Sequence, residues 1–221
     1  MATTVPAFRP VEGLANVFVA ESGNLRCAAI QLTDGGLCLF SPVSGLGDDA
    51  LASLSCLGEV RVLLAPNHYH NNGLAQYLKR FPPALLCASD AARPRLEKVT
   101  GLKFQTLEDV RTALPANVAC LEPRGLRNGE IWLRAVGSKH AAWIVVDAFC
   151  GPKGRAAQPA AEPELLSTFP RFGIGDRAGY LDWVTKQLSA DNPTMLVPCH
   201  GAIVAGPNLA AQLRSLMGTE I

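Results

Sequence analysis

Short apolar runs of strand length alternate along the chain with segments that have helical spacing. Residues 15–22 and 27–42 predict paired strands, because Asp34, Gly35 and Gly36 supply a turn between β-rich runs. Further runs of the same kind predict later strands. These runs are VRVLLAP (60–66), ALLCAS (84–89), EIWLRAVG (130–137), AAWIVVDAFC (141–150) and TMLVPCHG (194–201).

Five segments between and after these runs predict helices, from their spacing of apolar residues and their end signals. They are DDALASLSCLG (48–58), LAQYLKRF (74–81), ARPRLEKVTG (92–101), DRAGYLDWVTKQLS (176–189) and NLAAQLRSLM (208–217). Residues 151–164 are rich in Gly, Pro and Ala and predict a long exposed loop. The order of elements predicts an α/β protein, with a two-layered sheet core and helices outside.

Composition narrows the class of protein. The 221 residues suit one domain, 1–221, and 48% apolar with 18% charged residues is typical of a folded chain. The net charge of +1 and the absence of a 20-residue apolar run give no support to nucleic-acid or membrane partners. Seven cysteines without a CxxC pair favour reduced, mostly buried thiols in the cytoplasm. We expect a small-molecule substrate and leave a homo-oligomer open.

Candidate chemistry lies where buried strands end. His68 and His70 follow VRVLLAP, His200 follows TMLVP, and Asp147 ends AAWIVV. Strand ends of α/β proteins are where functional side chains gather. In an extended segment, residues two apart point to the same side, so both imidazoles of His68 and His70 are expected to reach one metal ion.

The order of these features resembles the metallo-β-lactamase superfamily. Members carry an HxHxDH motif after a buried strand, a later aspartate at a strand end, and a histidine before glycine near the C-terminus. The matching segments are NHYHNNG (67–73), WIVVDAF (143–149) and LVPCHG (196–201), and they extend the resemblance over essentially the whole chain. The resemblance implies the four-layered αββα sandwich of that family.

Two positions depart from the motif. Asn72 stands where the family has aspartate and Gly73 where it has the third histidine, so a two-metal site is not expected. The amide of Asn72 is neutral and cannot act as a base. The remaining ligand set is His68, His70, Asp147 and His200, for a single divalent ion that is zinc or, alternatively, iron or manganese.

Two other candidate residues, His140 and Cys199, are expected to lie outside this ligand set. His140 is seven residues from Asp147, which is about 23 Å along one strand, so we interpret it as an exposed turn residue. Cys199 adjoins His200 and is an alternative soft ligand, but core packing is favoured, because side chains alternate along a strand and that of Cys199 would face away from His200.

Two functions stay open. In the first, the protein is a divergent metal-dependent hydrolase in which one metal-activated water attacks an ester, thioester, lactam or phosphodiester, with Asn72 and Asp147 as catalytic residues. Residues 151–164 and FPRFGIGD (169–176) would then cover the site. In the second, the chain keeps the scaffold without its metal and serves a binding or structural role.

Overall fold

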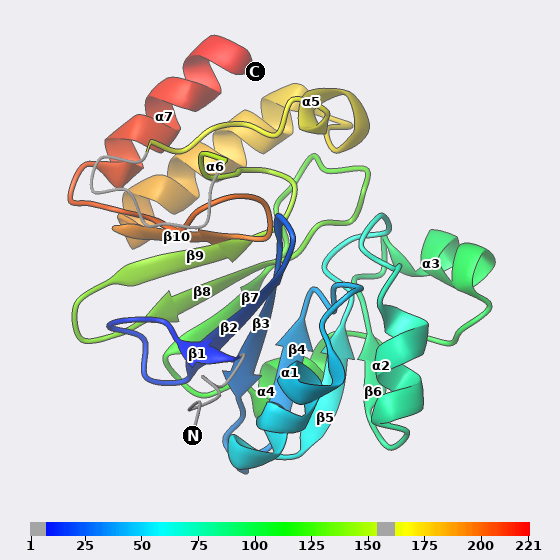
Figure 1. The fold of residues 1–221 in the computed structure, drawn as a ribbon. Coiled ribbons are helices and arrows are strands. Elements are labelled where there is room, and N and C mark those ends of the chain that lie inside the picture. Colours follow the sequence, from blue (N-terminus) through cyan, green and yellow to red (C-terminus); the bar gives the residue numbers. More distant parts are fainter. Residues whose placement is uncertain (1–7, 154–161) are drawn as a thin grey trace.

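The strands form two mixed sheets in the computed structural model, which describes residues 8–153 and 162–221 (Figure 1). The first sheet has the order β1 (Arg9–Pro10), β2 (Val17–Ser22), β3 (Leu25–Gln31), β4 (Leu37–Phe40), β5 (Val60–Leu64) and β6 (Leu85–Cys87). The second has the order β11 (Val204–Ala205), β10 (Met195–Pro198), β9 (Ala141–Val145), β8 (Trp132–Val136) and β7 (Val118–Leu121). Strands β4, β5 and β6 are parallel, as are β9 and β10.

The predicted pairing of the first strands is confirmed. Strands β3 and β4 pair antiparallel, with Ala28 opposite Phe40, and the backbone turns between them at Asp34 and Gly35. The Asp34 side chain accepts a hydrogen bond from the backbone N–H of Gly36 at 2.9 Å, which closes this turn.

All five predicted helical segments contain a helix, and residues 8–153 and 162–221 also hold two short helices that were not predicted. The helices are α1 (Asp48–Ser53) with the 3₁₀ turn η1 (Leu54–Cys56), α2 (Leu74–Arg80), α3 (Arg93–Thr100), α4 (Glu108–Ala113), α5 (Phe169–Phe172), α6 (Arg177–Asp191) and α7 (Leu209–Glu220). Helices α4 and α5 are the unpredicted ones. Asp176 caps α6 by accepting from the backbone N–H of Gly179.

The two faces of the second sheet bury different cores. Trp143 and Val145 of β9 pack in a cluster with residues of α6 and α7, whereas Ala142 and Ile144 pack in the cluster built on the first sheet. This alternation follows from the two-residue period of a strand. Helices α6 and α7 lie over the outer face of the second sheet and α1, α2 and α3 lie beside the first (Figure 1). The chain therefore has the predicted α/β sandwich of two sheets with flanking helices.

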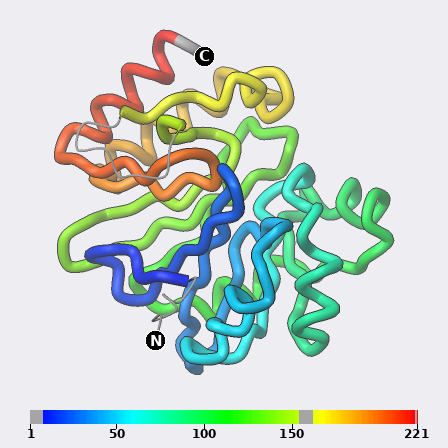
Figure 2. Tube along the Cα trace, viewed as in Figure 1, coloured from blue at the N-terminus to red at the C-terminus, as the bar shows by residue number. Residues whose placement is uncertain are grey.

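The path of the chain brings distant segments to one edge of the sandwich. The tube in Figure 2 runs through the first sheet, crosses at about residue 118 to the second, and ends in α7. The segments that follow β4, β5, β9 and β10 meet at the same edge, because each strand pair β4–β5 and β9–β10 is parallel. The candidate site is built from these segments.

All seven cysteines are free and five are buried, while Cys56 is exposed and Cys120 is half-buried. Most of the predicted loop 151–164 lies outside the described residues, so its role as a cover stays a prediction. Within the described ranges, no helix is long and apolar enough to cross a membrane.

Candidate metal and ligand site

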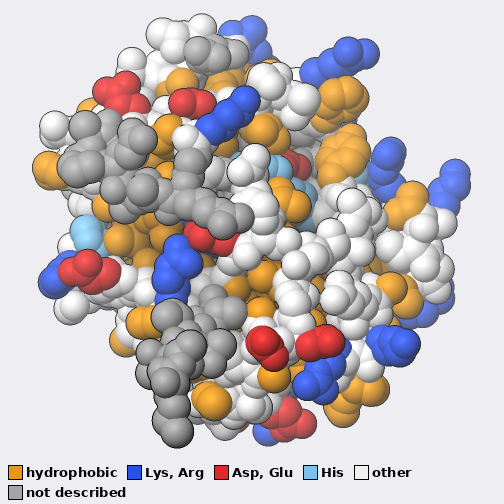
Figure 3. Space-filling view, in the orientation of Figure 1, with side chains coloured by type: hydrophobic (Ala, Val, Ile, Leu, Met, Phe, Trp, Pro, Cys, Tyr) orange, Lys and Arg blue, Asp and Glu red, His pale blue; other side chains and the backbone are white. Residues whose placement is uncertain are grey.

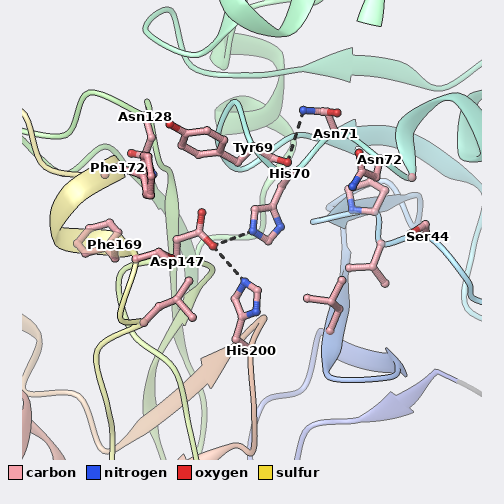
Figure 4. Close-up of a pocket in the computed structure, with 17 residues that line it drawn as sticks. Ser44, Tyr69, His70, Asn71, Asn72, Asn128, Asp147, Phe169, Phe172 and His200 are labelled. Atoms are coloured by element: carbon pink, nitrogen blue, oxygen red, sulfur yellow. Dashed lines mark hydrogen bonds and ion pairs between the residues drawn. The ribbon is translucent and has the colours of Figure 1, made fainter. Parts of the chain in front are cut away.

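Three of the four predicted ligands meet at the sheet edge. Nε2 of His70 lies 2.9 Å from Oδ1 of Asp147, and Nε2 of His200 lies 3.1 Å from the same oxygen (Figure 4). The imidazole rings of His70 and His200 are 5.5 Å apart between centroids. His200 and His70 are 53 and 77 positions from Asp147 in the sequence, and one carboxylate oxygen therefore joins them.

His68 does not join this cluster, which differs from the expectation that it lies beside His70. The segment after β5 is a turn rather than an extended strand: Oδ1 of Asn67 accepts hydrogen bonds from the backbone N–H groups of Tyr69 and His70. The two-residue alternation on which the expectation rested does not hold in a turn. The His68 ring is buried against Tyr69, and its Nε2 has no hydrogen-bond partner among the described residues.

Cys199 is buried in the core, as expected, and its thiol also joins the cluster. Strand β10 ends at Pro198, so strand alternation no longer fixes the direction of the following side chain. The thiol Sγ lies 3.9 Å from Nδ1 of His70 and 3.4 Å from the hydroxyl oxygen of Ser41. Donor atoms of His70, Cys199 and His200 all lie within 4.8 Å of one another.

A buried polar network holds Asp147 from behind. The amide of Asn67 donates to Oδ2 of Asp147 at 2.8 Å. Oε1 of Glu130 accepts from the backbone N–H groups of Asp147 and Ala148 and from the Trp132 indole, at 3.2, 3.1 and 3.0 Å. Both oxygens of Asp147 are therefore engaged, and its backbone is fixed by a second carboxyl group.

The network separates the pKa values of its two carboxyl groups. Burial and the nearby charge of Asp147 raise the pKa of Glu130 to about 7. Burial would also raise the pKa of Asp147, but hydrogen bonds from His200 and His70 outweigh it and lower that pKa. Asp147 is therefore the anion of the cluster at neutral pH.

The pKa values of His70 and Cys199 are shifted toward a charged pair. Burial opposes charge on His70, yet Cys199 and Asp147 raise its pKa well above the usual value. Burial likewise opposes the Cys199 thiolate, but His70, His200 and the Ser41 hydroxyl lower its pKa to about 7. A substantial share of thiolate is consequently expected at neutral pH.

A pocket of about 460 Å³ opens onto His70, Asp147 and His200. Its wall includes the predicted covering segment through Phe169 and Phe172, and it also includes Asn72. Figure 3 shows histidine side chains at the bottom of a hollow, with hydrophobic side chains at its edge. The other lining residues are Leu25, Pro42, Val43, Ser44, Tyr69, Asn71, Gly73, Asn128, Leu166, Thr168 and Gly173.

The altered motif positions have a structural counterpart. A Cβ atom at Gly73 would lie 2.2 Å from the carbonyl oxygen of Pro42, so a histidine does not fit there with the backbone in this position. Asn72 is exposed at the pocket wall. His140 lies outside the site, as expected, but it is half-buried rather than exposed, with Nδ1 3.1 Å from the hydroxyl oxygen of Thr194.

The cluster has the donor chemistry of a transition-metal site. Two imidazoles, a thiolate and a carboxylate are ligands of zinc and iron, and a thiolate disfavours manganese. Ligand atoms bonded at about 2.1 Å in tetrahedral geometry are themselves about 3.4 Å apart. The separations of 2.9 and 3.1 Å at Asp147 are shorter and have the length of direct hydrogen bonds, so a tetrahedral ion would need these side chains to move slightly apart.

Several functional residues were not singled out from the sequence. Ser41 directly follows the apolar strand β4, and Asn67 directly precedes the first histidine, so the rule applied to Asp147 points to both. Ser41 also has a φ of 57°, which is unusual for a residue other than glycine, and its hydroxyl lies 3.0 Å from Nδ1 of His70. Glu130 carries no comparable signal, because its burial depends on the packing of both sheets.

The fold is that of the metallo-β-lactamases. Solved structures with this fold align with nearly the whole chain at low sequence identity. A metallo-β-lactamase from Pontibacter korlensis is 12% identical with a TM-score of 0.60, covering 96% of this chain and 99% of its own. The DIM-1 metallo-β-lactamase is 13% identical with a TM-score of 0.62, covering 98% and 99%.

One further neighbour has a different described role. The chemotaxis sensor ODP, solved as a peroxy diiron species, is 15% identical with a TM-score of 0.62 and covers 96% of this chain and 94% of its own. No family model and no curated protein sequence matches the chain. At these identities the likeness establishes the fold, while the chemistry has to be argued from the site itself.

Proposed function

We propose that the protein is a divergent metallo-β-lactamase superfamily hydrolase with a single divalent metal held by His70, Cys199 and His200 beside Asp147. The observation that carries this proposal is the meeting of these donors at one pocket. The thiol favours zinc or iron as the metal. The reaction class is hydrolysis of an ester, thioester, lactam or phosphodiester of a small molecule.

A bound ion would supply a Lewis acid and would lower the pKa of water toward neutrality. The chain's own residues supply orientation. Ser41 hydrogen-bonds Nδ1 of His70, and Asn67 donates to Asp147. Neither the His70 ring nor the Asp147 carboxylate can therefore rotate freely. Asn72 at the pocket wall offers an amide for hydrogen bonding to substrate rather than a base.

Elemental analysis of tag-free protein tests the metal. After growth with added zinc and iron, we expect about one equivalent per chain, and His200→Ala and Cys199→Ser should each retain less than a tenth of it. His140→Ala is the matched control outside the cluster. His68→Ala should also keep its metal, because His68 does not contact the cluster donors.

A second function, a metal-free binding protein, is favoured by one specific observation. Asp147 is already satisfied by His70, His200 and Asn67 without any ion. Less than a tenth of an equivalent of metal in the unmodified protein after supplementation would reject the hydrolase and leave this reading. Stoichiometric metal that His200→Ala removes would reject the metal-free reading and direct a screen of the four substrate classes.

A further inference from the structure

The mouth of the pocket is aromatic. Tyr69 and Phe172 both line it and are 38% and 45% exposed, which places them among the few large apolar side chains that the described surface exposes. Their rings meet edge to face, with centroids 6.4 Å apart. Figure 4 shows Tyr69 and Phe172 near each other on the side of the pocket away from Ser44. Paired exposed aromatic rings at a pocket are typical of a binding site for an apolar group.

A guanidinium group lies over each of these rings. Arg95 from α3 lies over Tyr69 and Arg171 from α5 lies over Phe172, with Cζ 5.2 Å from the ring centroid in both cases. Neither arginine forms an ion pair with another described residue. Two positive groups are therefore held at the aromatic mouth with their hydrogen-bonding capacity available.

The inner part of the pocket has a different character. Most of its wall is apolar or neutral, and the one acidic side chain among the lining residues, Asp147, is paired there with His70 and His200. The two histidines are thus already engaged by a carboxylate, whereas the two guanidinium groups have no such partner among the described residues, so a negative group on a ligand is favoured at the mouth. An elongated molecule would lie with its apolar body along Phe169 and its anionic end at the mouth.

We propose that the pocket selects a small amphipathic anion, with an aryl or alkyl body and a carboxylate or phosphate group held by Arg95 and Arg171. This inference rests on the proposed function only in placing the bond to be cleaved at the His70–His200 end. The pocket volume of about 460 Å³ is in the range of small-molecule sites.

Calorimetry on metal-free protein at low salt tests the proposal with three probes of similar size. These are phenylbutyrate, phenylpropyl phosphate and the neutral phenylbutanamide. We expect at least one anionic probe to bind about fivefold or more tightly than the amide, because an ordered guanidinium pair adds a modest charge term. The anion that binds more tightly identifies the carboxylate or phosphate preference.

The double variant Arg95→Gln/Arg171→Gln should lose this preference for an anion. The control Arg80→Gln/Arg177→Gln removes the same net charge, and Arg80 also lies over an aromatic ring, that of Phe81, away from the pocket. Equal binding of all three probes, no binding of any, or an equal loss in both double variants would overturn the proposal.

The outcome is separable from that of the hydrolase proposal, because binding is measured without metal or turnover. Anion-selective binding in a protein that takes up no metal would leave the ligand class standing and remove the hydrolase. Stoichiometric metal binding without a preference for the anionic probes would leave the hydrolase proposal standing and remove the ligand class.

Discussion

Asp147 is the residue on which the candidate site depends most. Its side chain accepts from His70, His200 and Asn67 while lying about nine-tenths buried. Removing one partner from a buried charged pair typically costs about 3–5 kcal/mol. We therefore expect Asp147→Asn to lower the free energy of unfolding by about that amount in urea titrations of metal-free protein. Asp182→Asn, which removes an exposed carboxylate paired with Lys186, is the control and should change it by less than about 1 kcal/mol.

The pH dependence of stability follows from His70 and Glu130. Both pKa values are raised in the folded protein, that of Glu130 to about 7. A group whose pKa is higher in the folded than in the unfolded protein stabilises the fold at pH values below its unfolded pKa. This contribution is lost as the pH rises through its folded pKa. The contribution of these two groups to the free energy of unfolding of metal-free protein should therefore fall between pH 5 and about pH 7, while the lowered pKa of His68 acts in the opposite direction below its usual value and that of Cys199 does so above pH 7.

Glu130→Gln isolates the second of these groups. Glutamine keeps the oxygen that accepts from Trp132 and from the backbone of Asp147, but it does not titrate. Urea midpoints across this pH range should decline less steeply in the variant. An equal or steeper decline in the variant would contradict the raised pKa of Glu130.

At the scale of elements, Gly73 occupies the third histidine position of the motif at a point where the present backbone leaves no room for a side chain. It lies at the start of α2, and a Cβ there would lie 2.2 Å from the Pro42 carbonyl oxygen. We expect Gly73→Ala to cost about 1–3 kcal/mol through overpacking. The control is Gly47→Ala, at the start of α1, where a Cβ would meet nothing within 4 Å. Equal chemical-denaturation midpoints for the two variants would show that the Pro42 segment moves aside without cost.

The elements were predictable where one local pattern decides them. The apolar runs predicted β5, β9 and β10 because these strands are buried, and the strand-end rule brought His70, Asp147 and His200 together. The direction of single side chains in the following turns was not predictable from strand alternation. Asn67 turns the chain and separates His68 from His70, and the end of β10 at Pro198 frees Cys199 to contact His70.

At the scale of the whole molecule, the site lies where the two sheets are joined. Strand β3 of the first sheet bonds the segment after β10 of the second: the backbone N–H of Arg26 donates to the Cys199 carbonyl at 2.8 Å, and Leu25 bridges His200. The buried Arg26 guanidinium also donates to the Pro198 carbonyl and to Glu21. The positions of Cys199 and His200 relative to His70 thus depend on this connection between sheets.

Arg26→Met tests the connection by keeping an unbranched chain and removing the guanidinium. Lost charge-assisted hydrogen bonds should cost about 2–3 kcal/mol and leave the Pro198 carbonyl without this donor. Because β3 would then hold the segment after β10 less firmly, amide exchange at residues 199–201 should accelerate more than exchange within β9. Arg9→Met is the control, because Arg9 is the other partner of Glu21 and its side chain is 48% exposed. This substitution should cost less than about 1 kcal/mol. If the two variants shifted stability and local exchange equally, the guanidinium of Arg26 would contribute only as a surface charge, and the backbone bonds of β3 alone would hold the two sheets together at the site.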